Sequence, residues 1–461
     1  QGDYTRSVLD AIPPRAALEA RIAAFTGSFG TTRGYVRYAG RAFYEERTPG
    51  SDDFALFVRD AAGTSQLLDV AAMRASAGGK PFAINYFFAS PDGSKVAAGI
   101  SQGGSEAASI HVYDVATGKQ IAGPLDRADP GFVAWSEDSA HLYVTRLKKL
   151  APGDADIEKY RDTTVAAWDL KSDPVAIVGR TAGRGPTFLP DETPALSLWP
   201  GAPMAMAASL NGVQPELALW LAPVARLNDP GIEWMPLATR DDEVTAAVGA
   251  GDTVYLLSHK NAPTFQVLRV KAGQPLASAK VRVPADKERV IDAIHAASDA
   301  LYVLARRGAY TLLLRAVHDS AQVEEIALPL KGHIREAFAD PREPGITIRL
   351  ESFVVPPTTL TYDPVRRRFT DLQIGVTPRF DSGRYEVRDL EARAKDDVMV
   401  PNTLVRPKIA KGPQITVIQA YGFYGISQLA YFSFRTVSFL EAGGTYASCH
   451  VRGGGELGET W

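Results

Sequence analysis

The chain has 461 residues, of which 45% are hydrophobic, 22% charged and 9% aromatic, and this length corresponds to about two to four domains or one large repeat array. Its 50 basic and 53 acidic residues leave a formal net charge of -3. Without a basic excess we expect neither nucleic acid nor a membrane surface as a partner. The single cysteine, Cys449, excludes an intrachain disulfide and a cysteine-cluster metal site, and no apolar run approaches the roughly 18 residues that span a bilayer.

The first predicted element is a pair of helices within residues 4–25. Apolar residues recur there at helical spacing before and after Pro13 and Pro14. The two prolines interrupt the first helix and suit the first turn of the second, where no intrahelical donor is needed.

The start of the chain leaves its compartment open. No charged segment is followed by an apolar one, so we expect no uncleaved signal peptide. Gln1 is not an initiator methionine. A trimmed start and a removed leader both fit, and so do the cytoplasm and the bacterial periplasm.

From about residue 34 to residue 380 the sequence predicts strands only. Short β-rich runs alternate with clusters of Gly, Pro and Asp, as at 41–47, 54–59, 109–114 and 141–146. Long helical patterns are missing until about residue 428. An all-β stretch of this length is too long for a single sandwich.

A repeat explains this stretch. Clear copies of one strand, in which apolar residues are followed by aspartate and a turn, end at Asp60, Asp114 and Asp169. Weaker copies lie at 219–221, 268–271, 314–317 and 361–363, which gives a mean spacing of about 50 residues. A second signature, at 88–93 and 135–139, precedes a strand in two successive units. Such a period with about four strands per unit predicts a β-propeller, and seven copies predict seven blades that act mainly as scaffold.

After residue 380 the pattern changes to that of an α/β domain. We expect strands at 385–388 and 396–401, a parallel strand at 415–420 that is buried on both faces, a helix at 428–441 and a buried strand at 445–451. Two parallel strands do not make a stable sheet, so we expect further sequence, covalent or associated, to complete it.

Two motifs have the form of known sites. Residues 99–103, Gly-Ile-Ser-Gln-Gly, match the G-x-S-x-G nucleophile elbow. Because strand alternation resumes directly afterwards, at 109–113, we interpret this motif as a blade hairpin rather than a catalytic turn.

The second motif, Gly453-x-Gly455-x-x-Gly458, matches the dinucleotide fingerprint. Its confirmation would need a helix and an acidic residue about twenty positions later. We favour a tight loop that is pinned by a charge pair between the flanking Arg452 and Glu456.

Cys449 and His450 are adjacent, but neighbours on a strand point to opposite faces, so they do not form a dyad. We expect Cys449 to be a buried thiol. The seven histidines show no spacing typical of a metal site, and we expect neither a metal nor a cofactor.

The loop at 421–427 is the most informative segment. It follows the predicted strand at its carboxyl end, where open α/β sheets bind ligands. Gly422 and Gly425 would let the backbone approach a substrate, while Tyr421 and Tyr424 offer a phenolic donor and an aromatic wall. A tyrosine packed beneath the loop is the alternative, and the sequence leaves both open.

At three places the chain resembles the prolyl oligopeptidase family of serine peptidases. These are Tyr-Gly-Phe-Tyr-Gly-Ile-Ser at 421–427, Leu-Glu-Ala-Gly-Gly at 440–444 and His-Val-Arg-Gly-Gly-Gly-Glu-Leu-Gly-Glu-Thr-Trp at 450–461. Weaker matches at 261–263 (Asn-Ala-Pro), at 88–93 and in the N-terminal helices extend the resemblance over nearly the whole chain.

The resemblance implies a seven-bladed β-propeller inserted in an α/β-hydrolase domain, of which the chain holds the N-terminal helices and the first strands. It implies a helical segment at 1–32 that packs on the hydrolase domain, a propeller at 33–380, and the start of the hydrolase domain at 381–461.

The resemblance also implies roles for individual residues. Tyr421 matches a tyrosine whose hydroxyl stabilises the tetrahedral oxyanion, Tyr424 an aromatic residue lining the pocket for the residue before the cleaved bond, and Arg452 an arginine at the edge of the active site. The supporting residues of the two loops are Gly422, Gly425, Gly453, Gly454, Gly455 and Glu456.

The family's catalytic serine, aspartate and histidine follow in that order, and all would lie beyond these 461 residues. We therefore expect a serine endopeptidase that cleaves short peptides after proline, with this chain inactive alone and the propeller excluding folded proteins. Its partners would be short peptides and the remaining catalytic-domain polypeptide.

Two alternatives stay open. The loop reads Gly-Phe-Tyr-Gly where post-proline enzymes commonly show Gly-Gly-Phe-Asn, and together with 450–458 it also resembles oligopeptidase B, which cleaves after Lys or Arg. The rival class is a non-catalytic propeller that binds a peptide or protein through its channel.

Overall fold

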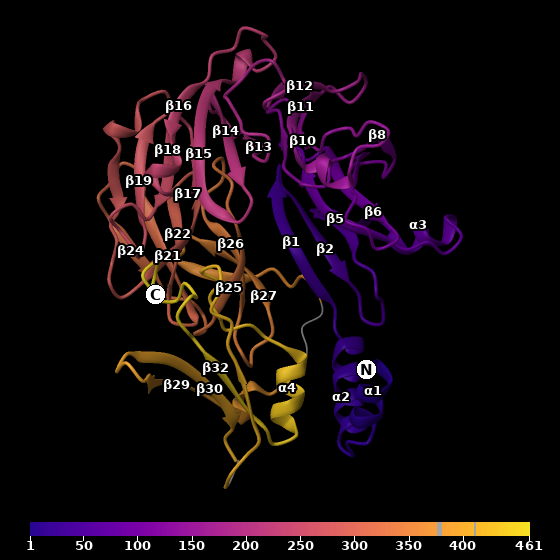
Figure 1. Cartoon of the computed structure of the whole chain (residues 1–461), viewed down its shortest axis with the longest axis vertical. Coiled ribbons are helices and arrows are strands. Elements are labelled where there is room, and N and C mark those ends of the chain that lie inside the picture. The colour runs from indigo at the N-terminus through magenta and orange to yellow at the C-terminus, as the bar shows by residue number, and fades with distance from the viewer. Residues whose placement is uncertain (376–379, 410–411) are drawn as a thin grey trace.

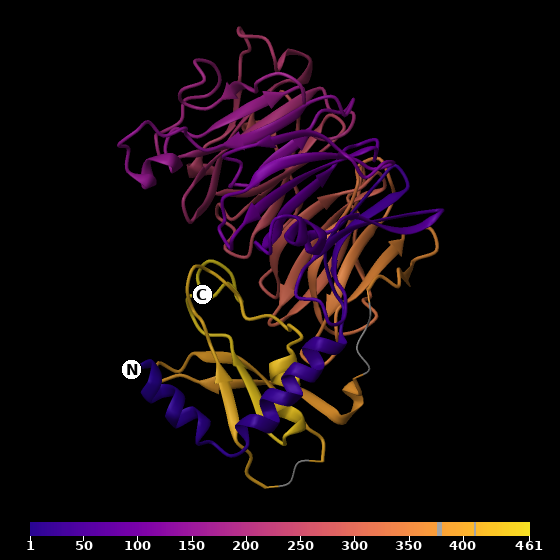
Figure 2. The same ribbon diagram turned by 90° about the vertical axis from the view of Figure 1, so that its right-hand side faces the viewer.

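Seven antiparallel four-stranded sheets follow one another along the chain, and an eighth, mixed sheet comes last (Figures 1 and 2). The computed structural model describes residues 1–375, 380–409 and 412–461. Within each of the seven sheets every strand pairs with its neighbour in sequence, as in the blades of a propeller. The prediction of seven blades is confirmed.

The strands of blades 1–4 are β1 Thr31–Tyr38, β2 Arg41–Arg47, β3 Ala55–Asp60, β4 Gly63–Leu68; β5 Phe82–Ala89, β6 Lys95–Gln102, β7 Ser109–Asp114, β8 Gln120–Leu125; β9 Val133–Trp135, β10 Leu142–Arg146, β11 Thr164–Trp168, β12 Val175–Val178; and β13 Thr193–Ser197, β14 Met204–Asn211, β15 Gln214–Pro223, β16 Met235–Ala238. Those of blades 5–7 are β17 Val244–Ala250, β18 Thr253–Ser258, β19 Gln266–Lys271, β20 Lys280–Val283; β21 Val290–Ala296, β22 Ala300–Arg307, β23 Tyr310–Val317, β24 Val323–Ile326; and β25 His333–Phe338, β26 Ile346–Glu351, β27 Thr358–Asp363, β28 Arg368–Asp371. A short helix, α3 Val70–Ser76, joins blades 1 and 2.

All seven copies of the repeated strand fall on, or at the end of, the third strand of a blade, from β3 to β27. The aspartate of the repeat ends that strand because its carboxylate accepts backbone N–H groups of the following turn. Asp114 accepts from the Thr117 N–H at 2.8 Å, and Asp363 accepts from the Arg366 N–H at 3.0 Å. The Arg366 N–H is the main cause of the lowered pKa of Asp363.

The second signature forms the turn between the first and second strands of blades 2 and 3. In it Ser90 donates to Asp92 at 2.6 Å, and Ser136 donates to Asp138 at 2.5 Å. The same serine hydroxyls accept from the N–H groups of Lys95 and His141, both at 2.9 Å.

The core lies between the blades. An apolar cluster of buried side chains joins each pair of consecutive blades from blade 1 to blade 7. Blades 4 and 5, for example, bury Leu219 and Leu256 completely. Burial of this kind supplies the main driving force for folding.

Blade 7 meets blade 1 through more polar contacts. The Gly34 N–H donates to Glu336 at 3.0 Å, and the rings of Tyr38 and Phe338 meet edge to face at 5.4 Å. The two ends of the propeller are thus joined by hydrogen bonds and aromatic edges.

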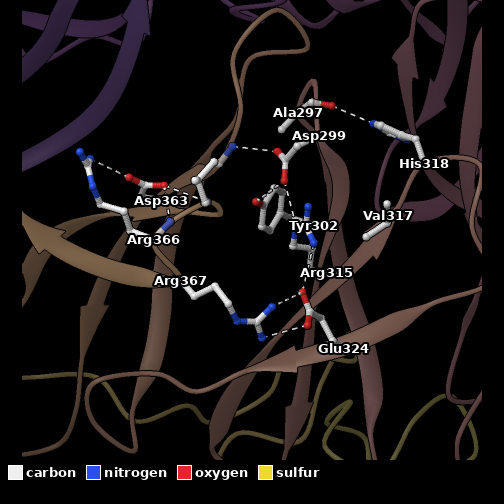
Figure 3. A network of polar contacts seen from close by, with 12 residues as sticks. Ala297, Asp299, Tyr302, Arg315, Val317, His318, Glu324, Asp363, Arg366 and Arg367 are labelled. Atoms are coloured by element: carbon white, nitrogen blue, oxygen red, sulfur yellow. Dashed lines mark hydrogen bonds and ion pairs between the residues drawn. The ribbon is translucent and has the colours of Figure 1, made fainter.

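Blades 6 and 7 also share a polar network (Figure 3). Asp299 accepts from the Tyr302 hydroxyl at 3.0 Å and from Arg315 at 2.9 Å. Glu324 accepts from Arg315 at 3.1 Å and from Arg367 of blade 7 at 3.0 Å. Carboxylates and guanidinium groups therefore alternate across the contact.

The eighth sheet belongs to the C-terminal module. Its elements are β29 Tyr385–Arg393, β30 Met399–Pro407, β31 Thr416–Gln419, α4 Phe434–Glu441 and β32 Thr445–Cys449. The strand order is β29-β30-β32-β31, with β32 antiparallel to β30 and parallel to β31.

The N-terminal helices, α1 Gly2–Asp10 and α2 Arg15–Ser28, return to this module (Figure 2). Phe25 and Phe29 stack on Phe434 of α4, with centroids 6.0 and 5.1 Å apart, and Arg21 pairs with Glu441 at 2.6 Å. The fold is a propeller inserted in an α/β-hydrolase domain, as predicted, while the exact domain limits at 32/33 and 380/381 stay predictions. Among the described residues, no helix is long and apolar enough to cross a membrane.

Two predicted elements need correction. The strand at 415–420 is parallel, but it lies at the sheet edge and is exposed: Val417 is 46% and Ile418 67% accessible, because no described residue covers it. The helix expected at 428–441 is only α4. The segment before it is not helical because its N–H groups bond elsewhere, that of Ala430 to the Ala309 carbonyl at 3.0 Å and that of Phe432 to Glu351 at 3.1 Å.

Candidate functional site

Two loops lie against each other in the C-terminal module. The aromatic loop, residues 421–427, follows β31, and the glycine loop, residues 451–457, follows β32. Because β31 and β32 are parallel neighbours, their carboxyl ends lie at the same edge of the sheet, where open α/β sheets place ligands. The Gly425 N–H donates to the Gly453 carbonyl at 3.1 Å and joins the two loops.

The glycines serve this loop-to-loop contact. A Cβ on Gly453 would lie 2.2 Å from the Gly422 carbonyl oxygen, and one on Gly455 would lie 2.5 Å from that of Gly425. Gly453 also has a φ of +85°, which disfavours any other residue. We expected Gly422 and Gly425 to let backbone approach a substrate; in the structure their backbones approach the glycine loop.

The tyrosines of the aromatic loop face outward. Tyr421 is 46% and Tyr424 73% exposed, so neither is packed beneath the loop. Tyr424 has a φ of +56°, a left-handed conformation that is costly for an aromatic residue and is often found at functional sites. The loop thus offers a phenol and an aromatic surface beside the ends of two parallel strands.

Arg452 and Glu456 do not pair with each other, and the expected charge pair is wrong. Arg452 forms an ion pair with Asp396, in the turn between β29 and β30. The guanidinium lowers the pKa of Asp396 by hydrogen bonding. Arg452 is half exposed, so it remains accessible at the edge of the site.

Glu456 points inward instead. Its residue is 2% exposed, and its carboxylate accepts the Gln428 N–H at 2.7 Å and lies 3.6 Å from His450 Nδ1. Burial acts to raise the pKa of Glu456, but the contacts with His450 and the Gln428 N–H outweigh it, and the pKa lies below its usual value. The two side chains do not meet because that of Arg452 is half exposed beside Asp396, whereas that of Glu456 is buried beside His450.

Cys449 and His450 separate as expected for neighbours on a strand. His450 is 1% exposed and contacts the Thr403 hydroxyl at 3.0 Å. Cys449 is partly buried rather than fully so, and burial raises the pKa of its thiol. A raised thiol pKa disfavours the nucleophilic thiolate.

The propeller also holds the glycine loop. The Arg306 guanidinium at the end of β22 donates to the Gly455 carbonyl and pairs with Asp292 of β21 at 2.6 Å. The Glu459 N–H donates to the Pro263 carbonyl of blade 5 at 2.8 Å. The Asn-Ala-Pro segment at 261–263 was the one sequence signal for these contacts; Arg306 and Asp292 carried none.

Of the two motifs that were set aside, the first does not form a nucleophile elbow, and the second is part of the glycine loop. Ser101 lies within β6, pairs with Ala83 and is 3% exposed, so it is not on a nucleophile elbow. The glycine loop turns back on itself through the bond from the Gly453 N–H to the Trp461 carbonyl at 3.2 Å. In the part of the chain that the structure describes, no cluster of His, Cys, Asp or Glu could hold a metal ion.

The propeller, the returning N-terminal helices and the paired loops at the strand ends define a propeller-bearing α/β-hydrolase. Residues 1–167 and 206–373 match the family described as "Prolyl oligopeptidase, N-terminal beta-propeller domain". This match covers more than half of the chain, which therefore belongs to the prolyl oligopeptidase family of serine peptidases.

Curated relatives agree with this assignment. The chain is 24% identical over 401 residues to the "Uncharacterized peptidase y4qF" of Sinorhizobium fredii, covering 82% of this chain and 51% of the relative. It is 23% identical over 383 residues to a prolyl endopeptidase of Elizabethkingia meningoseptica, covering 80% and 51%. The chain spans about half the length of these relatives.

Solved structures share the fold. A structure from a study of two prolyl endopeptidases matches with a TM-score of 0.86 and 22% identity, covering 100% of this chain and 67% of the other. Prolyl oligopeptidase B from Galerina marginata, bound to a 35-residue substrate, matches with a TM-score of 0.86, 18% identity and the same coverage.

Proposed function

We propose that the chain is part of a serine-type oligopeptidase that hydrolyses short peptides on the carboxyl side of proline. The outward-facing phenol of Tyr421, beside the ends of two parallel strands, carries this proposal. A phenol held at this edge can donate to the negative charge that develops on a peptide carbonyl during attack. Family membership and the peptide-bound relative support the same substrate class.

In this proposal each site residue has one role. Tyr421 stabilises the oxyanion, Tyr424 packs against the ring of a proline residue, and Arg452 binds the substrate at the edge of the site. A proline ring is compact and apolar, so an aromatic wall favours it by packing.

The Ser-Asp-His triad lies on polypeptide outside these 461 residues, and this chain is inactive alone. The exposed edge strand β31 supports this part of the proposal. Within β31, Val417 is 46% and Ile418 67% exposed, and an apolar strand edge of this kind is normally covered by another strand. The covering polypeptide would be the remaining catalytic domain, while the propeller would admit short peptides and exclude folded proteins.

The experiment compares fluorogenic substrates with proline or with Lys and Arg before the cleaved bond. It uses the enzyme that contains this chain together with the catalytic polypeptide, and the 461-residue chain alone as control. We expect cleavage after proline by the enzyme and no cleavage by the chain. Cleavage only after Lys or Arg would establish the oligopeptidase B-like alternative, and peptide binding without any cleavage would establish a non-catalytic propeller.

A further inference from the structure

Glu456 is a buried carboxylate whose expected partner, Arg452, pairs with Asp396 instead. Burying a charge is costly unless it is paired and hydrogen-bonded. The Glu456 carboxylate is nevertheless 2% exposed, and its Oε2 atom has no hydrogen-bond partner among the described residues. A buried carboxylate with one free oxygen needs an explanation beyond packing.

The other oxygen, Oε1, holds the end of the aromatic loop. It accepts the N–H of Gln428 at 2.7 Å, and Gln428 directly follows Ser427, the last residue of that loop. The loop is also held at Gly425, whose N–H donates to the Gly453 carbonyl at 3.1 Å. Both attachment points of the aromatic loop therefore lie on the glycine loop.

His450 lies next to the carboxylate, but its Nδ1 has no hydrogen-bond partner among the described residues. Its Nε2 lies 3.0 Å from the Thr403 hydroxyl, which lies 3.1 Å from Asp389. The single hydroxyl hydrogen of Thr403 goes to the Asp389 carboxylate, so His450 Nε2 donates to Thr403. The ring is thereby oriented with Nδ1 toward Glu456, at 3.6 Å.

The glycine at position 454 leaves room for this arrangement. A Cβ on Gly454 would lie 2.1 Å from Glu456 Oε2. Any side chain there would displace the carboxylate from the Gln428 N–H. Gly454 and Glu456 thus form one unit, in which the glycine makes space and the carboxylate makes the bond.

We infer that Glu456 is a positioning residue for the aromatic loop: through the Gln428 N–H it sets the place of the Tyr421 phenol. This inference rests on the proposed function, since it concerns the same site. Glu456 itself does not face the substrate side. Its effect on the reaction therefore passes through Tyr421.

The test is a double-mutant cycle in the complete enzyme, with a proline-containing fluorogenic peptide as substrate. We expect Glu456→Ala to lower kcat by about 10- to 100-fold, below the limit of about 10²–10³ for one oxyanion donor, and to change KM by less than about threefold. In a Tyr421→Phe background, Glu456→Ala should lower kcat by less than about a further threefold. If the double variant instead loses kcat by the product of the two single-variant factors, the two residues act independently and the inference is wrong.

A second variant, Gly454→Ala, tests whether a loss of activity in Glu456→Ala results only from misfolding. Residue 454 has a backbone conformation that alanine can adopt, and the new methyl group would mainly displace the flexible end of the Glu456 side chain. We expect the same loss of kcat and the same lack of additivity with Tyr421→Phe. Glu459→Ala, on the exposed side of the same segment, is the matched control and should leave kcat unchanged.

Hydrogen exchange tests this inference without depending on peptidase activity, so its failure can be distinguished from failure of the proposed function. The Gln428 amide should exchange faster in Glu456→Ala and Gly454→Ala, and at the unmodified rate in Glu459→Ala. An unchanged Gln428 rate in the first two variants would overturn the inference even in an active enzyme. If the unmodified enzyme cleaves no peptide, the proposed function fails, and faster exchange at Gln428 would still establish the attachment of the loop.

Discussion

At the scale of single residues, Tyr421 and Tyr424 show what the loop geometry adds to their chemistry. Both rings face outward, but Tyr424 alone has a left-handed backbone. That strain persists because Gly422 and Gly425 on either side are held by the glycine loop. The contacts with the glycine loop therefore fix the backbone from which both aromatic side chains project.

Tyr421→Phe tests the oxyanion role. Removing the hydroxyl deletes one hydrogen-bond donor while keeping the ring, so kcat in the complete enzyme should fall by about 10²–10³-fold with KM nearly unchanged. Steady-state kinetics on a proline-containing peptide measures both values. Tyr160→Phe, on an exposed propeller tyrosine, should leave them as they are. A full kcat in Tyr421→Phe would remove Tyr421 from the mechanism.

Asp292 makes stability depend on pH. Burial raises the pKa of Asp292 to about 6, although Arg306 acts to lower it, against about 3.9 in an unfolded chain. The folded state binds this proton more tightly, so the stabilisation is complete below about pH 4 and is lost as pH rises through 6. Two pKa units would correspond to about 3 kcal/mol, and the effect should be smaller because Asp292 is partly exposed and solvent screens its charge.

Asp292→Asn removes this titration. The melting temperature of the variant minus that of the unmodified protein should therefore increase between pH 4 and pH 7. Thermal unfolding followed by circular dichroism at each pH measures the difference. Asp52→Asn, at an exposed aspartate, should show a constant difference, and a constant difference for Asp292→Asn would contradict the pKa assignment.

The residues that hold the site were only partly predictable from the sequence. The glycines of residues 453–455 identified a tight loop because few other residues allow such close backbone contact. The partner of Glu456 was not predictable, because the bonded N–H belongs to Gln428 and has no side-chain signature. Arg306 contacts Gly455 across almost 150 residues of chain, and no local pattern reports a contact of that kind.

At the scale of elements, the network between blades 6 and 7 makes a prediction about stability (Figure 3). Arg315 lies between Asp299 and Glu324, and all three side chains are at most 17% exposed. Arg315→Met leaves both carboxylates without their shared partner, and breaking such buried pairs costs about 3 kcal/mol. Urea unfolding should show this loss as a lower midpoint.

The same network contains its own control. Arg366 pairs with Asp363 at a turn and is 69% exposed, and exposed pairs contribute about 0–1 kcal/mol. Arg366→Met should therefore leave the unfolding midpoint nearly unchanged. Equal midpoints for Arg315→Met and the unmodified protein would show that the network does not stabilise the contact between the blades.

Strands were predicted better than the helix before β32. Four of the third strands, β3, β7, β11 and β27, were found because an aspartate ends each of them by local hydrogen bonds, which are visible in the sequence. The other three were found from the spacing of the repeat. The helix start was missed because the N–H groups of Ala430 and Phe432 bond to the propeller. The spacing of apolar residues does not show that these N–H groups bond to the propeller rather than within a helix, because those bonds form only in the tertiary structure.

At the scale of the whole molecule, the exposed edge strand β31 predicts self-association of this chain. The backbone groups along its outer edge, which pair with no described strand, and its exposed side chains can pair with a second copy. We expect a concentration-dependent rise in mass by sedimentation, which Ile418→Lys should reduce. Val365→Lys changes an even more exposed apolar residue in a propeller turn and should not reduce the self-association. A monomer at all concentrations up to about 100 µM would contradict this prediction.

The C-terminal segment forms hydrogen bonds with equivalent positions of three consecutive blades. Pro263, Ala309 and Glu351 lie at or beside the turns between the second and third strands of blades 5, 6 and 7, and each accepts a backbone N–H from residues 430–459. The propeller and the C-terminal module therefore cannot be exchanged independently between relatives. A chimera that takes its propeller from another member of the family needs blades 5–7 and the segment from 428 to 461 from the same donor, because the docking surfaces have to match.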